Sequence, residues 1–227
     1  MEYVKYLSFL VPPLLAFLVY LYLRYKFRKL PFPMLFPSFL WGAASIILVL
    51  LIQYLANHFG LDQLTSLGRI LFYSLVVVGL FSELGKFFFL KGFIYPRESF
   101  KTPVDGILYA VMVSLGFATM NNLFFFINLP HLEVNMTNAL SAGPANLIFG
   151  VVMGFFLGMG KMRNFRFIDS LTSLGAAIIF HSIYTFCLLT NDTRLLWAFF
   201  IGSFIIAVSL CLAAIRMHDE AKSEAGI

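Results

Sequence analysis

The sequence predicts an all-α fold, a polytopic membrane helix bundle of about seven transmembrane helices. Of its 227 residues, 60% are hydrophobic and only 12% are charged, whereas about a quarter of the residues of soluble domains are charged. The mean hydropathy is +0.88. The apolar runs are continuous rather than alternating, which excludes a membrane β-barrel, and they match the roughly 20 helical residues that a bilayer core requires.

Each helix is predicted from one apolar run. The first run is expected to be a true span rather than a signal peptide, because its core is too long and no small-residue cleavage site follows it. The fifth run is short, and its helix is expected to begin as early as Ala142. No soluble segment interrupts the series, so residues 1–227 are expected to form a single transmembrane domain. The predicted spans are Tyr3–Leu23, Pro37–Ala56, Ile70–Phe89, Val104–Phe126, Ala145–Met159, Phe167–Leu189 and Leu195–Ile215.

The basic residues between the spans predict the orientation of the chain. Twelve Lys and Arg residues fall on one side of the predicted membrane and three fall on the other. The positive-inside rule then places the N-terminus outside and the C-terminus in the cytoplasm. The net charge of +5 arises from these short segments and not from a phosphate-binding face. Membrane lipids, and not nucleic acid, are therefore the expected surroundings.

A few polar side chains fall inside the predicted spans, where a charge costs several kcal/mol and therefore suggests function. Glu83 and Lys86 are three residues apart on the third span, so they share one helix face. Either they form a self-neutralising pair, or Glu83 points into a central polar cavity and Lys86 positions it. The other polar candidates, on the fourth, fifth and sixth spans, are Asn121, Asn122, Asn146, His181 and Thr185.

Small residues recur along the fifth span. Asn146 is followed at four-residue intervals by Gly150, Gly154 and Gly158. This GxxxGxxxG pattern allows another helix to approach closely. Packing of this seam is expected to carry Asn146 toward the interior of the bundle.

Four motifs between residues 80 and 189 resemble the PrsW family of intramembrane peptidases, which belongs with the CAAX prenyl-protease superfamily. The resemblance implies a membrane-embedded hydrolase that cuts a membrane-anchored, single-span protein, in the bacterial inner (plasma) membrane. It implies hydrolysis by glutamates and histidines that activate water, with a metal, zinc, as a possible cofactor. The motifs read "SELGK", "PVDGILYAVMVSLGFATMNNLFF", "GPANLIFGVVMGFFLG" and "HSIYTF".

The chain departs from the family pattern at four motif positions. Ser82 stands where the family has the first of two adjacent glutamates, although Glu83 and Lys86 are kept. Asn121 replaces the glutamate of a Phe-x-x-x-Glu-Asn motif, in which Phe117 and Asn122 fit. Asn146 replaces a histidine, and Thr185 replaces the Asp or Asn that comes four residues after His181. The last two departures leave Pro144 and His181 in place.

These departures limit the chemistry that the resemblance implies. Neutral asparagine cannot act as a general base, and a hydrolytic zinc site usually has three protein ligands. Of the motif positions, only Glu83 and His181 could ligate a metal. A metal-free mechanism would use Glu83 as the base, with Lys86 beside it and His181 or Asn121 polarising the carbonyl group.

Three functions therefore stay open from the sequence. The first is an intramembrane peptidase that hydrolyses a membrane-anchored protein at a buried Glu/His site. The second is a catalytically degenerate pseudo-peptidase that binds transmembrane partners. The third is a small-solute or ion transporter whose pathway is lined by Glu83, Lys86 and His181.

Overall fold

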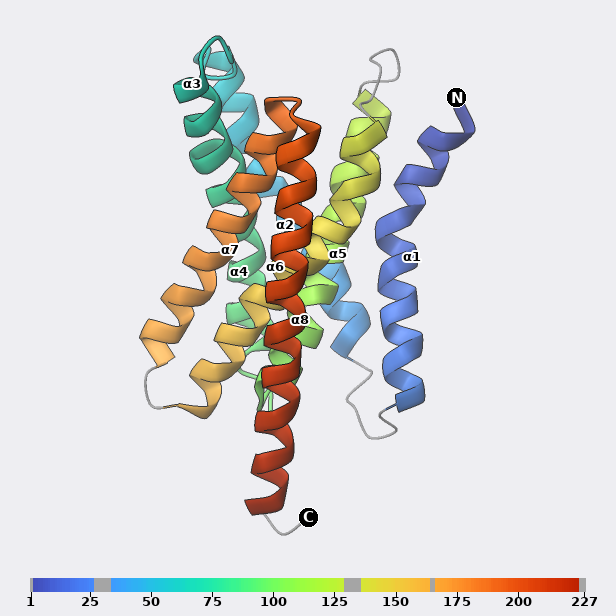
Figure 1. Ribbon diagram of the computed structural model, residues 1–227, viewed down its shortest axis with the longest axis vertical. Helices are drawn as coiled ribbons and strands as arrows, with labels where there is room; N and C mark the ends of the chain where they lie inside the picture. Colours follow the sequence, from blue (N-terminus) through green and yellow to red (C-terminus); the bar gives the residue numbers. More distant parts are fainter. Residues whose placement is uncertain (1, 27–33, 129–135, 164–165, 225–227) are drawn as a thin grey trace.

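The computed structural model describes residues 2–26, 34–128, 136–163 and 166–224 (Figure 1). Its described residues form helices and contain no β-strand, so the predicted all-α class is confirmed. The elements are α1 (Glu2–Lys26), α2 (Leu35–His58), α3 (Leu67–Phe72), the π-helix η2 (Tyr73–Leu80), α4 (Phe81–Phe89), the π-helix η3 (Leu90–Ile94), α5 (Pro103–Asn128), α6 (Met136–Met162), α7 (Arg166–Leu189) and α8 (Thr193–Glu224).

The helices make a polytopic membrane bundle. Among the described residues, six helical segments are long and apolar enough to cross a membrane, and α1 adds a shorter apolar stretch, Phe9–Tyr22. One of the six is the continuous segment Leu67–Ile94, which joins α3, η2, α4 and η3. Figure 1 shows α1 beginning at the end of the bundle opposite to the one at which α8 finishes. The membrane side on which each terminus lies stays a prediction.

Three predicted boundaries differ from the structure by more than a few residues, and one of them is the end of α8 at Glu224, beyond the predicted end at Ile215. The fifth span begins at Met136, before the predicted start at Ala142 or Ala145, and Pro144 lies inside it. A proline removes one backbone hydrogen bond, which transmembrane helices tolerate when neighbouring groups satisfy the freed carbonyl. The third span continues beyond Phe89 to Ile94 as the π-helix η3.

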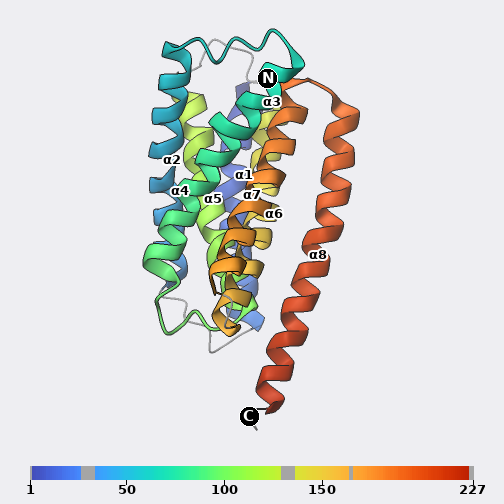
Figure 2. The same ribbon diagram turned by 90° about the vertical axis from the view of Figure 1, so that its left-hand side faces the viewer.

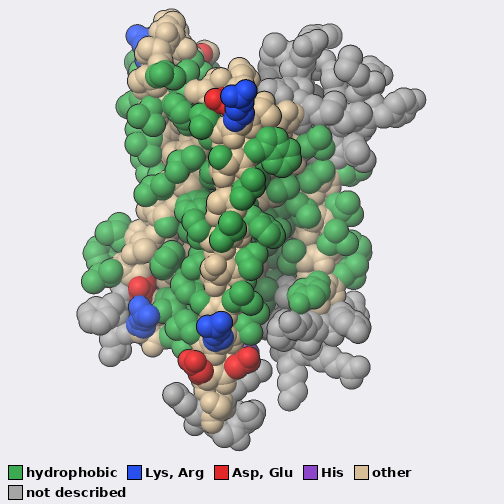
Figure 3. Space-filling model, viewed as in Figure 1, with side chains coloured by type: hydrophobic (Ala, Val, Ile, Leu, Met, Phe, Trp, Pro, Cys, Tyr) green, Lys and Arg blue, Asp and Glu red, His purple; other side chains and the backbone are tan. Residues whose placement is uncertain are grey.

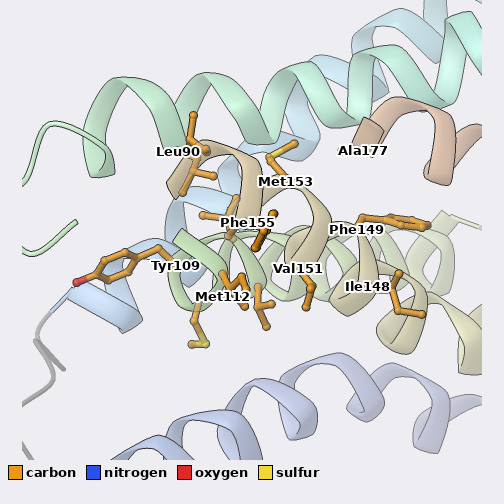
Figure 4. Packing of buried hydrophobic residues seen from close by; sticks show 14 of the residues in the cluster. Leu90, Tyr109, Met112, Ile148, Phe149, Val151, Met153, Phe155 and Ala177 are labelled. Atoms are coloured by element: carbon orange, nitrogen blue, oxygen red, sulfur yellow. The ribbon is translucent and has the colours of Figure 1, made fainter. Parts of the chain in front are cut away.

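The core lies between α5 and α6, which pack along much of their length. Most residues of these two spans are buried, whereas few residues of α8 are buried. Figure 2 shows α8 at the outside of the bundle. Figure 4 shows side chains of the core cluster from α5 and α6, with Leu90 and Ala177 from neighbouring elements. The labelled α5 and α6 side chains are Tyr109, Met112, Ile148, Phe149, Val151, Met153 and Phe155.

Glycines allow this close approach of α5 and α6. A Cβ atom on Gly154 would meet the backbone of Gly106, and a Cβ on Gly106 would meet the carbonyl oxygen of Gly154. Cβ atoms on Gly150 and Gly158 would likewise meet the α5 backbone. The glycine seam of α6 therefore lies directly on α5. Asn146 lies one helical turn before Gly150 on the same face, so its side chain points into the bundle.

The outer surface is apolar along the middle of the molecule. Figure 3 shows hydrophobic side chains covering the visible face of the described residues, with Lys, Arg, Asp and Glu gathered toward the two ends. Large apolar side chains such as Phe204 (63% exposed) and Ile47 (68% exposed) point outward. This belt of exposed apolar groups fits a hydrocarbon environment.

Candidate active site

The third span carries Glu83 to the centre of the bundle through its π-helical segment. π-Turns insert an extra residue into a helix and often lie at functional sites. Here η2 packs against α7, and the contact requires a glycine, since a Cβ on Gly79 would meet Oγ of Ser182. Gly79 lies one turn before Glu83, and Ser182 directly follows His181. The close approach therefore sets these two functional candidates opposite each other.

Glu83 contacts both Lys86 and His181 through one oxygen atom. Its Oε1 lies 2.5 Å from Nζ of Lys86 and 2.6 Å from Nδ1 of His181. Glu83 and Lys86 are wholly buried, and His181 is 5% exposed. Because an ionised carboxylate only accepts hydrogen bonds, Nδ1 of His181 is the donor. The carboxylate thus fixes the tautomer and the orientation of the imidazole ring, and it joins positions 98 residues apart.

Lys86 extends the cluster to α6. Its ammonium group donates a hydrogen bond to Oδ1 of Asn146 at 3.0 Å, and Nδ2 of Asn146 donates to the carbonyl oxygen of Ala142 at 3.0 Å. The second of these bonds holds the Asn146 amide against its own helix. The structure therefore brings together four of the residues predicted from the sequence, Glu83, Lys86, Asn146 and His181.

Aromatic rings enclose this cluster. Phe149 stacks on the ring of His181 with 4.8 Å between centroids, and Phe117 meets the same ring edge-on. Nζ of Lys86 lies 4.9 Å from the Phe117 centroid and 5.5 Å from the Phe149 centroid, which are cation–π distances. Phe149 is not among the site residues predicted from the sequence. The signal was its position three residues after Asn146, on the same helix face.

One oxygen of the Glu83 carboxylate remains available. Among the described residues, Oε2 of Glu83 is buried and has no hydrogen-bond partner, and the same is true of Oγ of the neighbouring Ser82. An unpaired carboxylate oxygen in a protein interior is unfavourable unless water or a ligand pairs with it. Oε2 is therefore the carboxylate oxygen that can accept a further hydrogen bond.

The structure does not join three predicted residues to this cluster. Asn122 donates to the carbonyl oxygen of Ala139 at 3.0 Å and so links α5 to α6 elsewhere. Asn121 is half-buried on α5. Thr185 is buried on α7, one turn after His181. In the described part of the chain, neither Asn121 nor Thr185 forms a hydrogen bond with Glu83, Lys86 or His181.

The zinc ion that the resemblance implies does not fit these residues. No group of three His, Cys, Asp or Glu side chains capable of holding a metal occurs among the described residues. Glu83 and His181 supply two candidate ligands, and a positively charged Lys86 contacts the carboxylate oxygen that a metal would take. Asn146 uses both of its polar atoms in hydrogen bonds. A cation placed here would also be repelled by the ammonium group of Lys86.

Comparison with known proteins places the chain in a family. A profile of the PrsW family of intramembrane metalloproteases matches residues 30–215. The "Protease PrsW" of Geobacillus kaustophilus is 30% identical over 95% of this chain and 91% of that protein. The "Protease PrsW" of Bacillus subtilis is 30% identical over 86% and 87%, and that of Halalkalibacterium halodurans is 31% identical over 79% and 81%. No solved structure matches the chain. The chain is a bacterial integral membrane protein, and it belongs to the PrsW family of intramembrane metalloproteases.

Proposed function

We propose that this chain hydrolyses a membrane-anchored protein within the bilayer and that Glu83 is its general base. One observation carries the proposal. The Glu83 carboxylate is wholly buried, with Oε1 held by Lys86 and His181 and with Oε2 unpaired. A carboxylate held in one orientation with one free oxygen is suited to bind and deprotonate a water molecule.

The reaction needs no group beyond this chain, its substrate and water. Oε2 of Glu83 takes a proton from water while the water oxygen bonds to the carbonyl carbon of the substrate peptide. The developing oxyanion is stabilised by the positive charge of Lys86, which acts strongly in an interior of low dielectric constant. The C–N bond then breaks, and Glu83 returns its proton to the leaving nitrogen. His181 positions the carboxylate through Nδ1.

A second candidate function is the binding of a transmembrane partner without hydrolysis. Two observations favour it. Amide side chains stand at Asn121 and Asn146, where the family pattern has an acid and an imidazole, and Glu83 is enclosed by protein at 0% exposure. In this alternative, the contacts of Glu83 with His181 and of Lys86 with Asn146 hold the helices together, and the surface of the bundle selects the partner.

The test is cleavage of single-span proteins by the full chain in lipid vesicles, with products identified by mass spectrometry. The wild-type chain is expected to release two fragments that account for every residue of the substrate. Glu83→Gln is expected to abolish release. Because Glu83→Gln leaves Lys86 unpaired, Glu83→Gln/Lys86→Met is tested beside it as a variant without a buried charge. Glu98→Gln changes an exposed glutamate in the same way and should cleave normally.

Two outcomes would overturn the proposal. Undiminished cleavage by Glu83→Gln would show that Glu83 is not the base. Partner binding would be supported instead by two results together. The wild-type chain would cleave no substrate, and it would co-purify stably with a single-span protein that stays intact. Thermal unfolding of each variant, followed in the same vesicles, separates loss of activity from loss of fold.

A further inference from the structure

A groove of about 430 Å³ lies between the end of the third span and the start of α7, away from the Glu83 cluster. It opens on the outer surface, because Phe167 is 80% exposed and Leu171 is 61% exposed. One end of the groove is cationic, with Lys91 and Arg166. Apart from Ser170, the remaining wall is apolar and is formed by Phe87, Phe167, Leu171 and Leu174.

The cationic end is fixed in place by neutral partners. Nζ of Lys91 donates to Oγ of Ser170 at 2.9 Å and lies 3.5 Å from the ring centroid of Tyr95. Lys161 from α6 lies over the same ring at 4.6 Å and donates to the carbonyl oxygen of Tyr95 at 2.7 Å. Two ammonium groups from different spans therefore share one aromatic ring beside the groove.

In the described part of the chain, no acidic side chain forms an ion pair with this cluster. Among the described residues, none of Lys91, Lys161 and Arg166 has a carboxylate oxygen within 4.0 Å. Lys161 and Arg166 lie close enough to Lys91 for their positive charges to act on it. Asp169, one turn along α7 from Arg166, forms no ion pair with any of the three. Three like charges collected beside an apolar groove leave the site complementary to an anion.

The position of the groove indicates the source of that anion. The groove belongs to segments long and apolar enough to cross the membrane, and it lies where Leu67–Ile94 ends and Arg166–Leu189 begins. This is the side of the predicted membrane to which twelve of the Lys and Arg residues fall. Basic pockets between spans at the membrane interface bind the headgroups of anionic lipids. A lipid also has apolar acyl chains, which can pack against the apolar wall of the groove.

We propose that this groove binds one anionic glycerophospholipid. Its phosphate lies at Lys91 and Arg166, which line the groove, and Lys161 adds positive charge beside them. One of its acyl chains lies along Phe87, Leu171 and Leu174. The lipid bridges the third span, which carries Glu83, and α7, which carries His181. It therefore stabilises the packing of these two segments, and this effect does not depend on whether the chain hydrolyses peptides.

The test measures binding and stability rather than cleavage. The full chain in detergent micelles receives phosphatidylglycerol or phosphatidylcholine and is followed by native mass spectrometry and thermal unfolding. Phosphatidylglycerol is expected to give a retained adduct of one lipid and a higher unfolding temperature. Lys91→Gln/Arg166→Gln should weaken that binding roughly tenfold or more, since each interfacial cation contributes measurably to attraction for anionic lipid.

The matched control is Lys101→Gln/Arg216→Gln. It removes two exposed positive charges that lie outside the groove but on the same predicted side of the membrane. This variant should bind phosphatidylglycerol as the wild-type chain does. Leu174→Trp keeps the cations and fills the apolar wall, so it should also weaken binding. It serves as the independent variant if the double substitution fails to fold.

Three results would overturn the proposal. The first is equal retention of phosphatidylcholine. The second is equal binding of phosphatidylglycerol by the wild-type chain and by the groove variants. The third is full competition by inorganic phosphate at a concentration similar to that of the lipid, because the site would then recognise free phosphate without a lipid chain.

Discussion

Nζ of Lys86 on α4 lies 3.0 Å from Oδ1 of Asn146 on α6, and both side chains are buried. Asn146 stands where the family pattern has a histidine. It accepts a hydrogen bond from the ammonium group and donates one to the carbonyl oxygen of Ala142. Asn146 thus places a neutral hydrogen-bond acceptor beside the ion pair of Glu83 and Lys86. A hydrolytic metal site needs a third ligand besides Glu83 and His181, and the amide at this position does not provide an acid or an imidazole.

The first prediction concerns Asn146 as a structural acceptor. Asn146→Leu leaves the Lys86 ammonium with one partner fewer in a buried site, which costs about 1–3 kcal/mol or more for a charged donor. We expect a correspondingly lower free energy of unfolding in detergent. The control is Asn121→Leu, which changes an asparagine outside the cluster and should have a smaller effect. Equal losses in the two variants would contradict the role assigned to Asn146.

The second prediction concerns the buried ion pair. Lys86→Met removes one partner and leaves the Glu83 charge uncompensated, so it should lower the free energy of unfolding by about 3–5 kcal/mol. The double variant Glu83→Gln/Lys86→Met carries no buried charge and should regain much of this loss. A double-mutant cycle from equilibrium unfolding gives the coupling between the two side chains. Additive effects would mean that the pair is not coupled.

The third prediction concerns metal content. We expect the purified wild-type chain to retain zinc far below one ion per chain and Glu83→Gln to leave that content unchanged, because two candidate ligands and a lysine make a poor site. Asn146→His provides a third candidate ligand beside Glu83 and His181, and it should raise zinc retention. The measurement is elemental analysis after dialysis. Stoichiometric zinc that is lost on Glu83→Gln would contradict the structural argument.

The fourth prediction concerns topology. With twelve basic residues on one side and three on the other, the C-terminus is expected in the cytoplasm. A fluorescent protein fused after α8 should fluoresce, and a phosphatase that is active only outside the cytoplasm should stay inactive at the same fusion point. The reverse pattern of the two reporters would show that the bundle is inserted the other way.

Much of the fold follows from the sequence, because hydrocarbon imposes a simple rule on backbone polar groups. Each must be satisfied within a helix, so continuous apolar runs identify the spans. The early start of α6 at Met136 could not be predicted in this way, since polar and small residues precede Pro144 and lower the hydropathy of that turn. The π-turns around α4 have no hydropathy signal either.

The candidate site could be predicted in part for a similar reason. Charges are rare inside these spans, so Glu83, Lys86 and His181 stand out by type alone. Their pairing depends on helix rotation, which η2 and the contact of Gly79 with Ser182 determine. Asn121 illustrates the limit. Its motif position suggested that it belongs to the site, but the structure leaves it half-buried on α5.

The last prediction tests the packing that turns Asn146 inward. Gly154→Ala would place a methyl group against the backbone of Gly106, where no flexible side chain can move away. Overpacking of this kind typically costs about 1–3 kcal/mol, and it outweighs the gain in helix propensity of about 1 kcal/mol that replacing glycine with alanine brings. Gly154→Ala should therefore lower the free energy of unfolding.

Gly175→Ala is the matched control for that change. Gly175 is also inside a transmembrane helix, but a Cβ there meets nothing within 4 Å, so this variant should be neutral or slightly more stable. Gly154→Ala should in addition shift α6 against α5 and weaken the contact between Lys86 and Asn146. Its effect should therefore be non-additive with that of Asn146→Leu in equilibrium unfolding. If Gly154→Ala were as stable as Gly175→Ala, the close contact of α5 and α6 could not be what orients Asn146.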